Sequence, residues 1–113
     1  MATYYHYTSR ESAQNIACGG KIIPGLSGRV FLTVCRYAIG HVAANELAIY
    51  GKAVEFGVEI DGVHVTNASR PRPAIPYQDQ TGKVVRAGGG LELTAKQDIQ
   101  ISSSNKWFPL DIP

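Results

Sequence analysis

The chain opens with a β-prone run that leads into a segment of helical periodicity. Residues 3–7 are mostly aromatic and β-branched, and Thr8 is followed three positions later by Glu11, the spacing of a capping box at a helix start. Apolar side chains then recur at helical spacing up to the Gly19–Gly20 pair. Because glycine readily adopts the left-handed cap conformation, we predict a strand followed by a helix that ends at this pair.

The next segments predict a second strand and a second helix. Residues 21–28 are rich in glycine and contain a proline, which indicates a loop, and residues 29–33 form a short β-prone run. From Tyr37 to Tyr50 apolar residues recur at roughly helical spacing, and Gly51 closes the segment. We therefore expect a loop, a strand over 29–33 and a helix over 37–50.

The second half of the chain has the pattern of strands. Between residues 54 and 60 apolar residues alternate with glutamate and glycine, as in a half-buried strand, and Asp61–Gly62 marks a turn. Residues 63–66 predict another short strand, whereas the prolines of residues 67–79 predict an irregular excursion without regular pairing. Three further runs are β-prone: Lys83–Ala87, Leu91–Ala95 and Ile99–Ser102. Two early helices and a strand-rich second half predict an α+β fold.

Composition and charge narrow the class of protein only slightly. A chain of 113 residues that is 44% hydrophobic has enough apolar material for one core, so we expect a single domain over residues 1–113. The formal net charge is +2 and the basic residues are dispersed, which neither requires nor excludes nucleic acid. Cys18 and Cys35 match no zinc or redox spacing, so we expect free core thiols in a reducing compartment. The chain shows neither a leader pattern nor an apolar run long enough to cross a membrane, which predicts a soluble protein.

Three segments combine polar chemistry with a suitable backbone context: residues 6–8, 28–33 and 88–94. His6 falls near the end of the first predicted strand, and Glu92 follows a run of three glycines, whose backbone can approach a ligand closely. A structural histidine, an outward-facing glutamate and a flexible hairpin tip are the alternatives for these features. No Lys-Ser or Lys-Thr pair follows the glycines, so they do not form a phosphate-binding loop of the nucleotide-hydrolase type. The three histidines are dispersed, so we expect no metal ion.

The order of these motifs resembles the His-Tyr-Glu/Asp group of ADP-ribosyltransferases, particularly the compact bacterial polymorphic-toxin domains. The resemblance covers roughly residues 4–102: a His-Tyr-Thr strand, a helix, a glycine-containing loop, an aromatic strand, a second helix and a late glycine-rich segment before an acidic residue. It implies an α+β fold with two N-terminal helices and a split, mainly antiparallel β core. It also implies that NAD is the substrate.

The resemblance assigns roles to individual positions. His6 would bind a ribose hydroxyl of NAD, and Glu92 would hold the nicotinamide-ribose 2'-hydroxyl and stabilise the oxocarbenium-like charge as the glycosidic bond breaks. Phe31 stands where the family often has tyrosine, so the stacking surface is kept and the hydroxyl is lost. Asp98 is the alternative acidic residue, since some related domains use aspartate. The predicted catalytic residues are Glu92 and His6, and the predicted NAD-binding residues are His6, Tyr7, Thr8, Arg29, Phe31, Thr33 and Tyr37.

Two arginines are candidate partners for the pyrophosphate of NAD, Arg29 and Arg10. The resemblance implies transfer of ADP-ribose to a protein or RNA by a toxin or effector domain with a cytoplasmic site of action, delivered as part of a secreted toxin and countered by an immunity protein. NAD hydrolysis without transfer and a non-catalytic nucleotide-binding module of the same fold are the alternatives. An RNA 2'-phosphotransferase activity is disfavoured because no basic cluster is visible.

Overall fold

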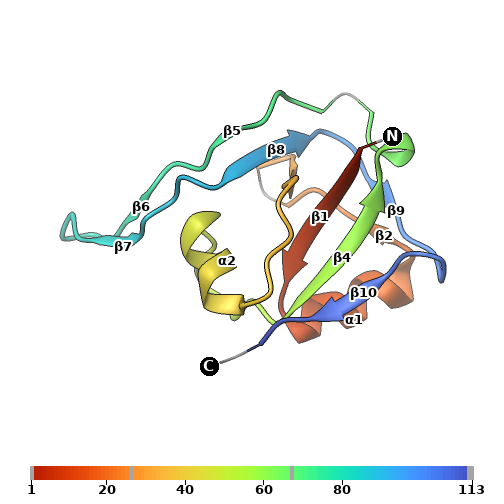
Figure 1. The fold of residues 1–113 in the computed structure, drawn as a ribbon, viewed down its shortest axis with the longest axis horizontal. Coiled ribbons are helices and arrows are strands. Elements are labelled where there is room, and N and C mark those ends of the chain that lie inside the picture. The colour runs from red at the N-terminus through yellow and green to blue at the C-terminus, as the bar shows by residue number, and fades with distance from the viewer. Residues whose placement is uncertain (1, 26, 67, 112–113) are drawn as a thin grey trace.

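Strand β1 (Thr3–Thr8) joins two antiparallel sheets at the centre of the fold (Figure 1). The computed structural model describes residues 2–25, 27–66 and 68–111. The first sheet has the order β1-β4-β10 and the second the order β3-β8-β5. Two backbone hydrogen bonds between Tyr5 and Thr33, of 2.8 and 3.0 Å, connect β1 to β3 and so tie the sheets together. The partners of β1 in these sheets are β4 (Phe56–Asp61), β10 (Trp107–Pro109), β3 (Val30–Leu32), β8 (Leu91–Ala95) and β5 (Arg72–Pro73).

Two smaller strand pairs and two helices complete the described chain. Strand β2 pairs with β9, and β6 pairs with β7 in a hairpin arm that extends away from the sheets (Figure 1). Their bounds are β2 (Lys21–Ile22), β9 (Ile99–Gln100), β6 (Tyr77–Gln78), β7 (Val84–Arg86), α1 (Arg10–Gly19), α2 (Gly40–Glu46) and the 3-10 turn η1 (Gly62–His64). Every pairing between named strands is antiparallel, and the predicted α+β class is confirmed. Neither described helix is long and apolar enough to cross a membrane.

The core has two clusters on opposite sides of β1. One contains Val58, Ile60 and Ile99, each fully buried, and Tyr4 packs against it. The other contains the buried Tyr7, with Tyr5 packed beside it. Successive side chains of a strand point to opposite faces, so Tyr5 and Tyr7 share one face while Tyr4, like the other even-numbered residues of β1, lies on the other. His6 and Thr8 therefore lie on the face opposite Tyr7.

Helix α1 begins one residue later than its capping pattern predicts. Ser9, not Thr8, is the N-cap, and its Oγ accepts a hydrogen bond of 3.2 Å from the backbone N–H of Ser12. Thr8 stays in β1 opposite Phe56. The predicted end is confirmed, because Gly20 has a φ of 73° and donates its N–H to the Ile16 carbonyl.

Helix α2 is much shorter than the predicted 37–50. The hydroxyl of the buried Tyr7 donates to the Cys35 carbonyl at 3.1 Å and accepts the Tyr37 N–H at 2.6 Å, which holds the chain before α2 in a non-helical path. After α2, Ala48 has a φ of 54°, which a continuing right-handed helix does not permit. The helical periodicity outside Gly40–Glu46 reflects packing against the second cluster.

Several strand predictions are corrected. Residues 63–66 do not form a strand, because the Asp61 carboxylate accepts the Val63 N–H and starts η1. The proline-rich segment does pair with other strands, at β5 and β6. Proline is possible in β5 because this edge strand does not need every N–H, and the β6 pairing has a register shift between Tyr77 and Gln78. Strand β10 was not predicted.

The remaining corrections are local. Loop 21–28 was expected to lack a strand, but its first two residues form β2. Cys18 is exposed, so it is a free thiol but not a core residue. Two positions of predicted segments, Leu26 in the loop and Asn67 at the start of the proline-rich excursion, lie outside the described residues.

Candidate functional site

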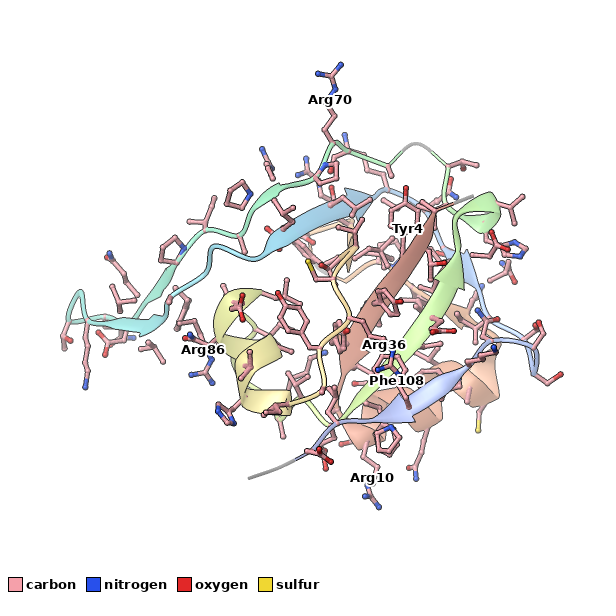
Figure 2. The ribbon with its side chains drawn as sticks, viewed as in Figure 1. Tyr4, Arg10, Arg36, Arg70, Arg86 and Phe108 are labelled. Atoms are coloured by element: carbon pink, nitrogen blue, oxygen red, sulfur yellow. The ribbon has the colours of Figure 1, made fainter. Side chains whose placement is uncertain are left out.

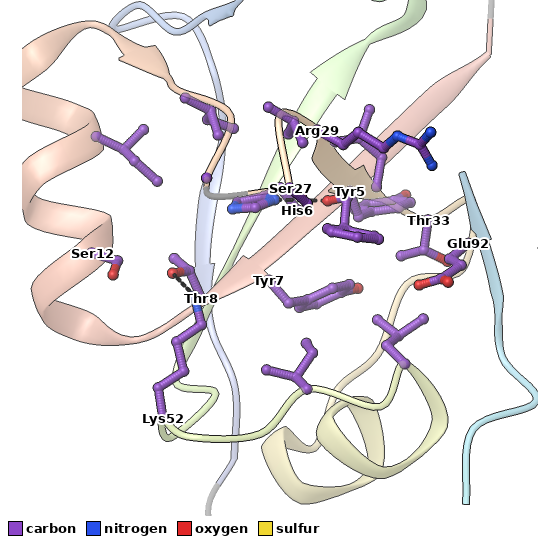
Figure 3. Close-up of a pocket in the computed structure, with 18 of the residues that line it drawn as sticks. Tyr5, His6, Tyr7, Thr8, Ser12, Ser27, Arg29, Thr33, Lys52 and Glu92 are labelled. Carbon is purple, nitrogen blue, oxygen red and sulfur yellow. Dashed lines mark hydrogen bonds between the residues drawn. The ribbon is translucent and has the colours of Figure 1, made fainter. Parts of the chain in front are cut away.

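A cavity of about 770 Å³ lies between α1, β1, β3 and the segment that follows α2 (Figure 3). This volume lies within the usual range for small-molecule sites. Apart from Tyr37, every predicted site residue lines it: His6, Tyr7, Thr8, Arg29, Phe31, Thr33 and Glu92. Three strands that are distant in sequence therefore bring these residues together.

His6 is held in one orientation by the neighbouring strand. Its Nδ1 lies 2.9 Å from the Phe31 carbonyl oxygen (Figure 3). A carbonyl only accepts, so Nδ1 carries the proton and Nε2 presents a lone pair in the neutral ring. Burial lowers the pKa of His6 to about 4, outweighing the hydrogen bond to Phe31, and the charge of Lys52 lowers it further. At neutral pH His6 is therefore an uncharged hydrogen-bond acceptor.

Glu92 lies on β8, directly opposite Arg72 of β5. It is half-buried, and burial raises the pKa of its carboxyl above the ordinary value, while the charge of Arg72 acts in the opposite direction. The described residues offer its carboxylate no hydrogen bond or ion pair. Its charge is therefore available to a ligand in the cavity.

The three glycines before Glu92 approach other backbone and not the cavity. Gly88 and Gly90 donate their N–H groups to the Asn45 and Glu46 carbonyls at the end of α2, and Gly89 donates to Ala74. A Cβ on Gly90 would meet the Tyr37 hydroxyl at 2.7 Å. The glycine run thus packs the start of β8 against α2.

Phe31 and Arg29 present unengaged groups at the Glu92 side of the cavity. Phe31 is 48% exposed although it belongs to a strand whose neighbours, Val30 and Leu32, are buried. Arg29 lines the cavity and forms no ion pair among the described residues. An exposed aromatic face beside a carboxylate suits a cationic ring.

The hydroxyl groups in the cavity wall are largely used within the protein. Thr33 Oγ1 donates to the Leu91 carbonyl at 2.6 Å and accepts the Cys35 N–H at 3.0 Å. The Tyr7 hydroxyl both donates and accepts a hydrogen bond, and burial raises the pKa of Tyr7 to about 12. These two residues shape the cavity by holding β3, β8 and the chain before α2 in place.

Three other candidates lie elsewhere. Tyr37 does not line the cavity; its ring packs edge-on against Tyr7 at a centroid distance of 5.6 Å. Asp98, the alternative acidic residue, is paired with Lys21 at 3.3 Å and does not line the cavity. Arg10, which Figure 2 shows beside α1, places its guanidinium over the Phe56 ring at 5.7 Å and does not line the cavity.

Sequence reasoning missed several polar residues of the cavity wall, among them Lys52, Ser12 and Asn15. Lys52 follows α2 in a loop, and its Nζ donates to Thr8 Oγ1 at 3.2 Å (Figure 3). Nothing in the sequence around Lys52 marks it. Ser12 and Asn15 are three residues apart on the helix that follows His6, and this spacing was a usable indication of one polar face.

The site thus combines a neutral imidazole acceptor, a carboxylate, an exposed aromatic ring and three cationic side chains around one cavity, of which Lys21 is paired with Asp98. Such a set can bind sugar hydroxyls, a positively charged ring and an anion. Among the described residues, no cluster of three His, Cys, Asp or Glu side chains could hold a metal ion. No family model, curated protein or solved structure matches this chain.

Proposed function

We propose that this protein is an NAD-dependent ADP-ribosyltransferase that cleaves the nicotinamide-ribose bond in the cavity between β1, β3 and β8. The observation that carries the proposal is that His6, Phe31 and Glu92 line the same cavity although they lie far apart in the sequence. The resemblance in motif order assigns these three positions to one NAD site. Two sheets joined through β1 are compatible with the split β core that the resemblance implies.

Glu92 is proposed to stabilise the transition state. When the C1'–N bond breaks, its electron pair leaves with nicotinamide and positive charge develops on the ribose. A carboxylate held near the ribose stabilises that charge and accepts a hydrogen bond from the 2'-hydroxyl. The acceptor's lone pair then forms the new bond to C1', and the acceptor loses a proton.

His6 and Phe31 are proposed to position NAD. Nε2 of the neutral His6 ring accepts a hydrogen bond from a ribose hydroxyl, because Nδ1 already donates one to the Phe31 carbonyl. The exposed Phe31 ring offers its face to the cationic nicotinamide. Neither interaction needs the tyrosine hydroxyl that the family often has at this position.

The decisive experiment is incubation with NAD and measurement of released nicotinamide. Glu92→Gln keeps the shape of the side chain and removes its charge, so we expect nicotinamide release to fall by at least about a hundredfold with little change in folding. Glu59→Gln is the matched control, because Glu59 lies on β4 and does not line the cavity. Full activity of Glu92→Gln together with loss of activity in Asp98→Asn would transfer the acidic role to Asp98. No release by the wild-type protein would favour a non-catalytic module.

The fate of ADP-ribose separates transfer from hydrolysis. With NAD labelled in its adenylate half, label that stays on protein or RNA identifies a transferase, and label found only in free ADP-ribose identifies an NAD glycohydrolase. His6→Ala in the same assay is expected to weaken NAD binding by about 1 to 2 kcal/mol, the value of one hydrogen bond. If His6→Ala unfolds the protein and NAD does not raise the Tm of the wild type, His6 is a structural residue.

A further inference from the structure

Lys52 places a positive charge on the side of His6 that faces away from Glu92. Figure 3 shows Lys52 and Thr8 on one side of His6 and Glu92 on the other. Thr8 is only 1% exposed, so its hydrogen bond with Lys52 draws the ammonium group to the cavity wall. His6 and Thr8 are two residues apart on one face of β1, which separates them by roughly 7 Å along the strand.

The Lys52 charge has no anionic partner within the described residues. Lys21, the other lysine of the cavity wall, is paired with Asp98, but no carboxylate in residues 2–25, 27–66 or 68–111 pairs with Lys52. Partial burial accordingly lowers the pKa of Lys52, although much of the residue remains exposed. An anion beside Lys52 would offset this desolvation of the positive charge.

Two uncharged residues with hydrogen-bond donors also line the cavity, and Figure 3 shows one of them, Ser12, on the same side of His6 as Lys52. Ser12 and Asn15 of α1 both line it, and among the described residues neither the Ser12 hydroxyl nor the Asn15 amide group forms a side-chain hydrogen bond. An ammonium group, a hydroxyl and an amide in one cavity wall match the oxygen atoms of a phosphate group.

We propose that Lys52, Ser12 and Asn15 form a subsite for the diphosphate of a dinucleotide. The identity of the ligand as NAD rests on the proposed function. In NAD a single ribose separates the nicotinamide from the diphosphate. Figure 3 shows the same order in the cavity, with Glu92 on one side of His6 and Lys52 on the other, and Phe31 belongs to the strand that pairs with the strand of Glu92. The subsite therefore sets the direction in which NAD lies. Lys52 takes the pyrophosphate role that the sequence suggested for Arg29, which lies on the Phe31 side.

The test compares ligands with and without phosphate. Inorganic diphosphate, NAD and nicotinamide riboside are titrated by calorimetry into wild type, Lys52→Gln, Lys52→Arg and Lys83→Gln. Lys83→Gln is the control for net charge, because Lys83 is exposed, adjoins β7 and does not line the cavity. We expect Lys52→Gln to bind diphosphate and NAD about 10- to 100-fold more weakly, as for a lost hydrogen bond to a charged group, and nicotinamide riboside unchanged. Lys52→Arg keeps the charge and is expected to retain most of the affinity for both phosphate ligands.

The outcomes separate this inference from the proposed function. Lys52-dependent binding of diphosphate without binding of NAD would support an anion subsite and remove NAD as its ligand. Equal NAD affinity of wild type and Lys52→Gln would overturn the subsite and leave the proposed function standing. Failure of the wild type to bind diphosphate or NAD, or an equal loss of nicotinamide riboside affinity in Lys52→Gln, would also overturn it.

Discussion

At the scale of residues, the hydrogen bonds divide the cavity wall into groups that hold the structure and groups that face a ligand. The hydroxyls of Tyr7 and Thr33 are bonded to backbone atoms of neighbouring segments. His6 Nε2, the Glu92 carboxylate and the Phe31 ring have no such partners among the described residues. Substitutions in the first group should therefore change stability, and those in the second should change binding and catalysis.

Phe31 tests this division. Phe31→Ala is expected to weaken NAD affinity by about 1 to 2 kcal/mol, because the ring face for the cationic nicotinamide is lost. Its stability cost should stay below about 1 kcal/mol, since the side chain is already 48% exposed. Phe31→Tyr should keep most activity. NAD titration and urea denaturation of the same proteins distinguish this from core packing, which would cost roughly 3 to 5 kcal/mol of stability.

Arg72 should set the acid limit of activity. Glu92 must be ionised to stabilise positive charge, so activity should fall as the pH drops through its pKa, which burial raises. The charge of Arg72 lowers that pKa, and Arg72→Gln should therefore move the acid limb of the pH-activity profile to higher pH. The measurement is nicotinamide release against pH for both proteins. Coincident acid limbs would show that a group other than Glu92 controls the profile.

At the scale of elements, β1 carries both the site and the core. Its even-numbered residues His6 and Thr8 line the cavity, while Tyr7 on the other face both contributes to the cavity wall and belongs to the second core cluster. Strand β3 continues this arrangement, because Val30 and Leu32 are buried and Phe31 between them is exposed. Strand alternation thus allows adjacent residues to serve packing and binding.

The glycine run before β8 is expected to be required for packing. Gly88 has a φ of 70°, and a Cβ there would collide with the Ala74 carbonyl. Gly82 has a φ of 85° with open space around it, so Gly82→Ala measures backbone strain alone, about 1 kcal/mol. Gly88→Ala should lose at least about 2 kcal/mol of unfolding free energy, since overpacking adds to the strain. Equal losses in the two variants, measured by urea denaturation, would show that Gly88 is needed only for its φ.

At the scale of the whole molecule, the site spans both sheets. His6 comes from the first sheet and Phe31 and Glu92 from the second, and the Tyr5–Thr33 hydrogen bonds hold the two together. The hydrogen bond from His6 to the Phe31 carbonyl crosses the same junction. Protonation of His6 would place a charge on this partly buried ring, so it costs folding free energy through desolvation, although the hydrogen bond from Nδ1 to Phe31 is kept.

The free energy of unfolding should depend on pH through His6. The folded protein holds the pKa of His6 at about 4 against an ordinary value of 6.5, so between these values the unfolded chain binds more protons. Stability should fall as the pH drops from 6.5 towards 4, by up to about 3 kcal/mol. His6→Asn removes the titrating ring but keeps a donor for the Phe31 carbonyl, so it should flatten this dependence. Urea denaturation at several pH values provides the comparison, and identical slopes for both proteins would contradict it.

The sequence by itself determined the helices and strands that depend on the residues of one short segment. The alternation around Val58 and Ile60 indicated β4, the run from Leu91 to Ala95 indicated β8, and the glycine pair after α1 indicated its end. Each depends on the pleat of a strand or on the backbone freedom of glycine, which a short segment already contains. The motif order also selected His6 and Glu92, which the fold brings to one cavity.

Only the tertiary structure decided the features that depend on contacts distant in sequence. The Tyr7 hydroxyl prevents a longer α2. The close approach of Ala74 explains Gly88, and packing against Tyr37 and the end of α2 explains Gly90. The place of Lys52 in the cavity follows from its hydrogen bond to Thr8, 44 residues away. Periodicity reports which face of a segment is apolar but not which segment it meets, so partners of this kind are fixed by the assembled sheets alone.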